Sequence, residues 1–149
     1  MHSFKDNTGH EWRIELNVAV NRKVRTEIGV DLNLINEDLI TKLYTNPEML
    51  VDVISIVLTD QIKKQDLDEY GFASRIIGDT VNHACDALMD ELVFISPRSQ
   101  RAIAGAAWKK IRKAESMLEQ KAMSVLGSDK IDEKLQEIMD EMEEKLMSS

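Results

Sequence analysis

The chain has very little cysteine and few aromatic side chains. A single cysteine, Cys85, cannot form an internal disulfide bond, which is typical of proteins in a reducing compartment. It joins the apolar face of an expected helix that carries Ala84 and Leu88, and it is interpreted as a small core residue. Aromatic residues make up only 5% of the sequence, whereas there are eight Met, so we expect a mostly aliphatic and adaptable core.

Long apolar runs are also missing. No stretch approaches the roughly 18 apolar residues that a membrane-spanning helix needs, and the first residues contain no hydrophobic signal-peptide core. We therefore expect a protein of the cytoplasm with no membrane partner. No internal repeat or low-complexity tract is present.

The spacings that mark catalytic and metal sites are absent as well. The sequence contains no G-x-S-x-G, glycine-rich phosphate loop, H-E-x-x-H or C-x-x-C. His83 and Cys85 lie two residues apart on an expected helix, so their side chains point to different faces. His2 and His10 face each other across an expected hairpin, but no third ligand accompanies them. We expect no enzymatic activity, no cofactor and no native metal site.

What is present is the composition of a globular protein. Hydrophobic residues make up 43% and charged residues 31% of 149 residues, which suggests one domain with a real core. The net charge of −8 argues against non-specific binding of nucleic acid. One basic cluster, Lys109–Lys113, lies beside Trp108 and is the one candidate contact for nucleic acid. Neutralisation of this cluster by an acidic last helix is the simpler explanation of its charge.

The most apolar stretch is Pro47–Leu58, and after Glu48 only Asp52 and Ser55 interrupt its apolar run. Its β-branched residues fit either a buried strand or a buried helix, and its ends favour the helix. Asn46 is a suitable N-cap and Pro47 fits the first helical position. We expect this helix to lie inside the protein, with amphipathic helices packed around it.

The first residues alternate between apolar and polar side chains. Residues 6–9, D-N-T-G, supply a turn, so His2–Leu16 is predicted to form a β-hairpin whose apolar face carries Trp12, Ile14 and Leu16. A lone hairpin is marginal in water, so this face must be covered. Two interpretations remain open here: the hairpin docks on the helical core, or its edge pairs with a partner strand.

Capping residues and apolar periodicity predict the remaining helices. They are Asn17–Ile28 with Val20, Val24 and Ile28 buried, Asn36–Thr45, a short helix within residues 65–78 carrying Tyr70, Phe72, Ile76 and Ile77, Asp79–Phe94, Pro97–Val125 and Asp129–Met147. The fold class is therefore mainly α, a bundle of about six or seven helices with an N-terminal β-hairpin. We expect residues 1–96 to form a core domain and residues 97–149 a C-terminal helical pair, which can belong to the same domain.

The last two predicted helices carry opposite charge. Residues 97–126 contain seven Lys or Arg against two Glu, whereas residues 128–149 contain eight acidic residues against three Lys. An αα-hairpin joined at Gly127-Ser128 would bring the two surfaces together. Alternatively, the last helix stands free and offers its Met-rich seam to another protein.

Several stretches resemble one protein family. They are H-S-F-K-D-N-T-G-H-E-W-R-I-E-L-N-V, R-T-E-I-G-V-D-L, L-I-T-K-L, P-E-M-L-V-D-V-I-S-I-V-L and G-D-T-V-N-H-A-C-D-A-L-M-D-E-L-V-F-I-S-P. In this order, over residues 1–97, they are similar to small tail assembly chaperones of long-tailed bacteriophages and prophages. The two C-terminal helices match less distinctly.

The resemblance implies a mostly helical, non-enzymatic protein in the cytoplasm of an infected bacterium. Such chaperones bind the tape measure protein and keep it soluble until tail tube subunits polymerise around it. The tail tube protein is a second possible partner, and a homo-oligomer is compatible with the hairpin edge. The alternative is a structural head–tail connector or adaptor that stays in the phage particle.

Flexible apolar side chains suit a chaperone that holds amphipathic helices. The candidate partner-binding residues are Met117, Met123, Leu135, Ile138, Met139 and Met142.

Overall fold

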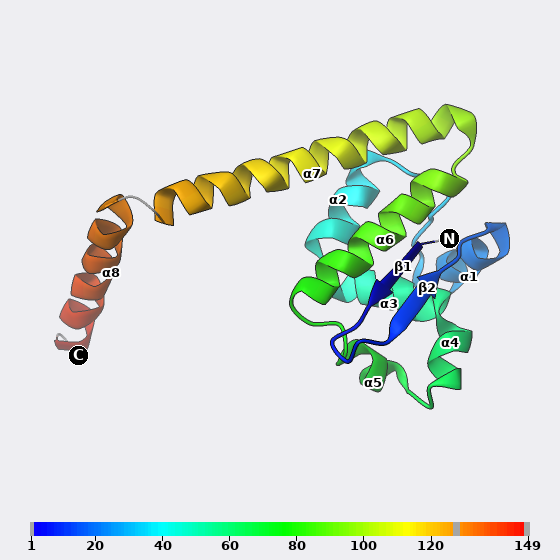
Figure 1. The fold of residues 1–149 in the computed structure, drawn as a ribbon, viewed down its shortest axis with the longest axis horizontal. Coiled ribbons are helices and arrows are strands. Elements are labelled where there is room, and N and C mark those ends of the chain that lie inside the picture. Colours follow the sequence, from blue (N-terminus) through cyan, green and yellow to red (C-terminus); the bar gives the residue numbers. More distant parts are fainter. Residues whose placement is uncertain (1, 127–128, 148–149) are drawn as a thin grey trace. The chain divides into compact units, whose positions relative to one another are not determined.

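The computed structural model describes the backbone of residues 2–126 and 129–147 and the side chains of residues 2–124 and 135–147. Within these ranges a two-stranded hairpin precedes eight helices, six of them at least seven residues long (Figure 1). The elements are β1 (His2–Lys5), β2 (Glu11–Ile14), α1 (Val18–Ile28), α2 (Glu37–Thr45), α3 (Pro47–Val57), α4 (Thr59–Lys64), α5 (Glu69–Ala73), α6 (Asp79–Ile95), α7 (Arg98–Leu126) and α8 (Asp129–Met147). The mainly α fold with an N-terminal hairpin is confirmed.

Three asparagines set the starts of the first three helices. Asn17, Asn36 and Asn46 each accept a hydrogen bond from the backbone N–H three residues further along, at 2.8, 2.8 and 3.1 Å. These bonds satisfy donors that the first helical turn leaves free. At the other end of α1, Gly29 has a φ of +71°, the left-handed conformation that glycine adopts without strain. The predicted boundaries of these helices are confirmed.

The chain divides into two compact units, residues 1–109 and 110–149. In the first unit α3 contacts α1, α2, α4, α5 and α6, so the most apolar stretch lies at the centre (Figure 1). Its inner face buries Leu50, Val53, Ile54 and Leu58. The other face is only half-buried at Val51, so the expectation of a helix enclosed all round holds for one face only.

The hairpin docks on this helical core. Its strands pair antiparallel, with Phe4 opposite Trp12 and His2 opposite Ile14. Phe4, Trp12 and Ile14 are buried, and the Trp12 ring meets the Phe72 ring edge to face, with centroids 5.0 Å apart. Helix α6 packs mainly against β1 (Figure 1). The predicted hairpin and its docking are confirmed.

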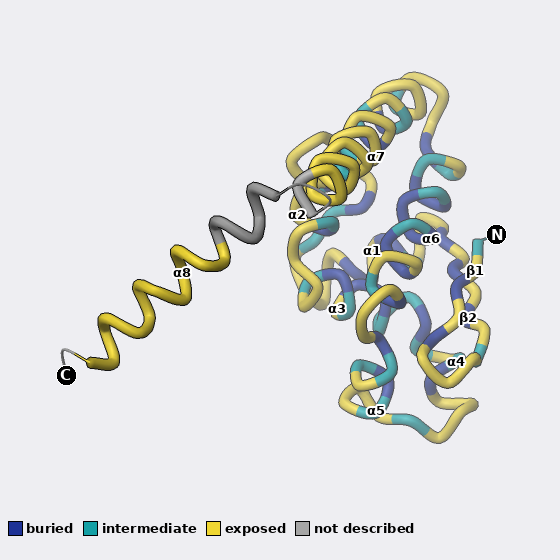
Figure 2. The backbone as a smooth tube through the Cα atoms, turned by 60° about the vertical axis from the view of Figure 1, so that its left-hand side comes forward, coloured by how far each residue is buried: buried dark blue, intermediate teal, exposed yellow. Residues whose placement is uncertain are grey.

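Helix α6 carries the longest continuous part of the core. Ala84, Leu88 and Leu92 recur every four residues along its buried face, and Cys85 is buried beside them. This agrees with the interpretation of Cys85 as a core residue. Figure 2 shows the buried residues of α6 in dark blue, in contrast to the exposed outer faces of the surrounding helices.

Residues 98–109 of α7 belong to the first unit. Ala104 and Trp108 are buried there, and the Trp108 ring lies edge to face with the Tyr44 ring, with centroids 6.3 Å apart. The sequence grouped these residues with the C-terminal helices instead. Whether residues 97–149 form a domain of their own stays a prediction.

Some predicted core positions are wrong. Ile28 is 37% exposed, because the buried face of α1 is centred on Val24 and on Asn21, whose amide donates to the side chain of Asn33. Helix α5 ends at Ala73, so Ile76 and Ile77, which the sequence placed on this helix, lie beyond it. Phe72 and Ile76 are buried, whereas Tyr70 and Ile77 are exposed.

The second unit consists of the C-terminal part of α7 together with α8. Every described side chain of α8, from residue 135 to 147, is exposed (Figure 2). The alternatives of an αα-hairpin and a free last helix both depend on residues 127–128, which lie outside the described residues. Among the described helices, none is both long and apolar enough to cross a membrane.

Candidate interaction surfaces

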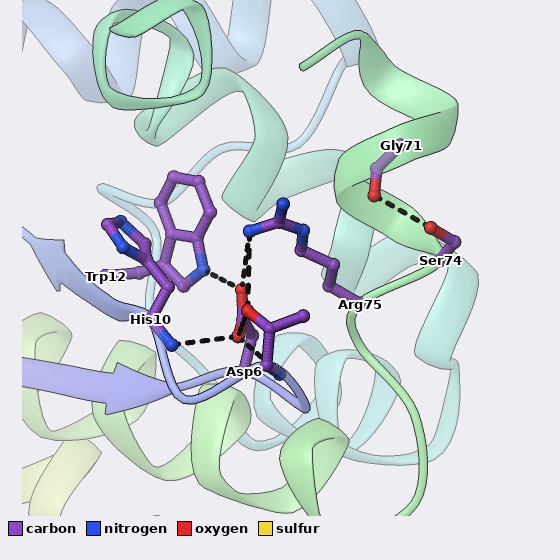
Figure 3. Close-up of polar contacts among 7 residues, drawn as sticks. Asp6, His10, Trp12, Gly71, Ser74 and Arg75 are labelled. Atoms are coloured by element: carbon purple, nitrogen blue, oxygen red, sulfur yellow. Dashed lines mark hydrogen bonds and ion pairs between the residues drawn. The ribbon is translucent and has the colours of Figure 1, made fainter. Parts of the chain in front are cut away.

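One buried carboxylate organises the hairpin turn (Figure 3). Asp6 is 6% exposed, and its Oδ1 accepts hydrogen bonds from the Thr8 hydroxyl at 2.6 Å, the Thr8 N–H at 2.8 Å and the His10 N–H at 3.1 Å. Its Oδ2 accepts from the Trp12 indole N–H at 2.8 Å and lies 3.5 Å from the guanidinium of Arg75. We call these residues the Asp6 cluster.

Two opposing effects act on the pKa of Asp6. Burial raises the pKa, because it penalises the charged form. Hydrogen bonds from the side chains of Thr8 and Trp12 and from the backbone N–H groups of Thr8 and His10 stabilise the carboxylate and lower the pKa. The hydrogen bonds prevail, so the pKa lies below its ordinary value of 3.8. All donors come from the hairpin or its neighbour, so the cluster is a structural feature of the fold.

The histidines singled out in the sequence occupy separate surroundings. The Nδ1 of His2 lies 2.8 Å from Oε2 of the buried Glu91, and the His10 ring packs edge to face against Trp12. His83 is exposed on α6. In the part of the chain that the structure describes, no three His, Cys, Asp or Glu side chains are grouped to hold a metal ion.

The basic cluster of α7 does not present an aromatic ring. Trp108 is 4% exposed, so its indole is not available to stack on a base. Lys109 and Lys113 are exposed beside it. Basic side chains without a stacking platform offer only a weak nucleic-acid surface.

An acidic groove runs between α1, α3 and α5 and has a volume of about 490 Å³. Ile28, Ile56 and Tyr70 contribute apolar surface to it. Its lining contains the carboxylates of Glu27, Asp52 and Glu69 and no basic side chain. The outer face of α3 that the sequence placed inside the core thus opens onto this groove.

A second groove of about 520 Å³ lies between β1 and α6 and is called the β1 groove below. Ser3 and Lys5 line it from the strand, Glu11 from the neighbouring strand, and His83, Asp86 and Asp90 from the helix. The sequence pattern gave no indication of either groove, because each combines residues that are far apart in the chain.

The predicted partner-binding residues are all exposed. On α8, Leu135, Ile138, Met139 and Met142 follow the spacing i, i+3, i+4, i+7 and share one face, each more than half exposed. We call them the α8 apolar face.

On α7 the two candidate residues do not share a face. Met117 and Met123 are 61% and 73% exposed. They lie six residues apart, which separates their side chains by roughly 120° around the helix axis. The α8 apolar face is therefore the more coherent part of the predicted surface.

Comparison of the chain with protein-family models, with curated proteins and with solved structures finds no match in any of the three.

Proposed function

We propose that this protein is a non-enzymatic binding protein, the tail assembly chaperone of a long-tailed bacteriophage or prophage. Its client in this proposal is the tape measure protein, which it holds in a soluble form in the cytoplasm of the infected bacterium while the tail tube assembles. The observation that carries the proposal is the α8 apolar face, four adjacent apolar side chains that are more than half exposed. The resemblance of residues 1–97 to such chaperones names the client.

The chemistry of this face suits a helical client. An amphipathic helix presents apolar side chains at the same i, i+3, i+4, i+7 spacing, so two such faces can pack along their length. Met139 and Met142 have flexible, polarisable side chains that adapt to partners of different shape. A chaperone that meets many segments of one long client benefits from this tolerance.

Charge contributes solubility and selectivity. The remaining faces of α8 carry Asp140, Glu141, Glu143 and Glu144, and the whole chain has a net charge of −8. Like charges keep complexes apart in solution. The acidic flanks also favour client helices that carry Lys or Arg beside their apolar stripe.

The test is co-expression with the tape measure protein encoded in the same phage genome. Changing Met139 and Met142 together to Asp places two charges on the face. Each buried Met contributes on the order of 1–2 kcal/mol to binding, so we expect at least about a thirtyfold loss of affinity in a pull-down titration. The soluble fraction of the client should fall in parallel.

The matched control is Gln136→Asp. Gln136 is exposed on α8 about 100° around the helix from Leu135, so it adds a negative charge outside the α8 apolar face. Binding by this variant should stay within about threefold of the unchanged protein, the range expected of a peripheral charge. Undiminished client binding by the Met139→Asp, Met142→Asp variant would remove the α8 apolar face from the proposal.

A second experiment separates a chaperone from a structural connector or adaptor. A chaperone leaves once assembly is complete, so mass spectrometry of purified phage particles should not detect it. Stoichiometric amounts in the particle would contradict the proposed function and favour the connector.

A further inference from the structure

The two edges of the hairpin differ in the hydrogen bonds that their outward backbone groups make. At the β2 edge, the side-chain amide of Gln61 donates to the Arg13 carbonyl at 2.8 Å and accepts from the Arg13 N–H at 3.0 Å. This amide makes the two hydrogen bonds that a neighbouring strand would make. The β2 edge is therefore closed at Arg13.

The strand register shows which backbone groups point outward at the β1 edge. The backbone N–H and C=O of Arg13 bond to Gln61, on the side away from β1. Ser3 pairs with Arg13 in the register, so this pair is not hydrogen-bonded within the hairpin. The backbone N–H and C=O of Ser3 therefore point away from β2. The bond from the Asp6 N–H to the His10 carbonyl at 3.0 Å confirms this alternation. Lys5 is two residues from Ser3 and points its backbone groups to the same side. In the described part of the chain no hydrogen bond to these outward groups occurs.

The β1 groove lies along this edge. Its volume of about 520 Å³ adjoins all four residues of β1, and one stripe of α6 lines its other side. His83, Asp86 and Asp90 recur along that stripe at intervals of three and four residues. With Glu11, the lining holds three carboxylates against one lysine, Lys5.

We propose that the β1 edge binds an extended segment of a partner protein that carries Lys or Arg at every second position. The segment adds as a third strand, and its backbone pairs with Ser3 and Lys5. Alternate side chains of an added strand face the same side, so its basic residues lie against Asp86 and Asp90. A second copy of β1 fits less well, because it would bring a second acidic α6 stripe to the same place.

This surface belongs to residues 1–109 and uses none of the residues of the α8 apolar face. The inference is therefore independent of the proposed function.

The test uses a defined probe, a fluorescein-labelled eight-residue peptide of alternating Lys and Thr, in anisotropy titrations at low salt. Ser3→Pro removes the one outward N–H at that position and leaves the bonds between β1 and β2, whereas Ser3→Ala keeps the N–H. We expect Ser3→Pro to bind the peptide at least about tenfold more weakly and Ser3→Ala to bind it normally. A peptide of alternating Glu and Thr should not bind.

A second pair of variants does not involve the hairpin backbone and covers the case in which Ser3→Pro disturbs folding. Asp86→Asn with Asp90→Asn removes two charges from the β1 groove, and Asp52→Asn with Glu69→Gln removes two charges from the acidic groove. The first pair should weaken peptide binding about threefold to tenfold and the second by less than about twofold.

Three results would overturn the proposal. They are equal binding by Ser3→Pro and Ser3→Ala, equal effects of the two charge pairs, or no saturable binding of the Lys-Thr peptide at millimolar concentration. A dimer in sedimentation that is lost in Ser3→Pro would assign the edge to a second copy of this chain instead.

Discussion

Replacing Asp6 with alanine removes the acceptor that the whole hairpin turn shares. Trp12 is fully buried, so its indole N–H, now 2.8 Å from the Asp6 carboxylate, would lose its partner without access to water. A buried donor without a partner costs about 1–3 kcal/mol. The hydrogen bonds from Thr8 and His10 are also lost, and since those groups are more accessible, water replaces them in part. We expect Asp6→Ala to lower the free energy of unfolding by about 3–5 kcal/mol in total.

Asp6→Asn removes the negative charge of Asp6 and keeps the shape of its side chain, so it separates the two contributions to stability. The side-chain oxygen of asparagine still accepts hydrogen bonds, but its NH₂ group then replaces one of the two acceptors. It faces either the Trp12 N–H together with the guanidinium of Arg75, or the backbone N–H groups of Thr8 and His10, donor against donor. We expect a loss of about 1.5–3 kcal/mol, between the unchanged protein and Asp6→Ala. Urea unfolding at pH 7, followed by tryptophan fluorescence and circular dichroism, measures both variants.

Asp31→Asn is the matched control. Asp31 accepts one local hydrogen bond, from the Asn33 N–H at 3.0 Å, in an exposed turn that asparagine also forms readily. Its cost should stay below about 0.5 kcal/mol. The reasoning would be refuted if Asp6→Ala cost less than about 1 kcal/mol, the size of an ordinary surface change, or if both Asn substitutions cost the same.

The pH dependence of the same variants gives an independent measurement. Because the pKa of Asp6 is below 3.8 in the folded protein, its ionised form stabilises the fold fully above that value. This stabilisation is lost as the pH falls through the lowered folded pKa. The stability difference between the unchanged protein and Asp6→Asn should therefore be constant near neutral pH and shrink below about pH 4. A difference that grows on acidification would contradict the assigned direction.

Three further changes test the fold elsewhere. Gly105→Ala should stabilise the protein by about 0.5–1 kcal/mol in thermal unfolding, because the added Cβ meets only the Val93 side chain, at 3.8 Å, inside a helix. Gly29→Ala should instead destabilise it by about 1 kcal/mol, because a φ of +71° strains a residue with a Cβ, and a neutral result would reject the left-handed cap. Gln61→Ala should accelerate hydrogen exchange of the Arg13 amide at least about tenfold, and unchanged exchange would show that the β2 edge is closed by another group.

The elements predicted correctly are those whose signals are local. The three Asn caps each act over three residues, and the hairpin turn together with its period-two alternation lies within residues 2–16. Gly29 ends α1 because its own backbone adopts the left-handed conformation. Such features depend little on what the rest of the chain does.

The features that sequence reasoning missed depend on distant residues. Asp6 was interpreted as a turn residue, but its cluster includes Arg75, 69 positions away, and the closure of the β2 edge depends on Gln61, 48 positions from Arg13. Ile28 satisfies the apolar periodicity of α1 and is nevertheless exposed, because the tertiary contacts rotate the buried face toward Asn21. No pattern within a single helix contains this information.

The candidate binding surface was predictable only in part. The spacing of Leu135, Ile138, Met139 and Met142 defines one helical face from sequence alone, and these side chains are exposed as a binding surface requires. Met117 and Met123 were grouped with them because of their side-chain type, although their spacing places them on different faces. The identity of the client stays a prediction.

Hydrogen–deuterium exchange of the complex with the tape measure protein tests the central claim most directly, the claim that this protein acts by contributing an apolar helical face to another protein. On client binding, the amides of residues 135–146 should gain protection, because an occupied helix opens less often. A stable complex in which these amides exchange as fast as in the free protein would contradict the account.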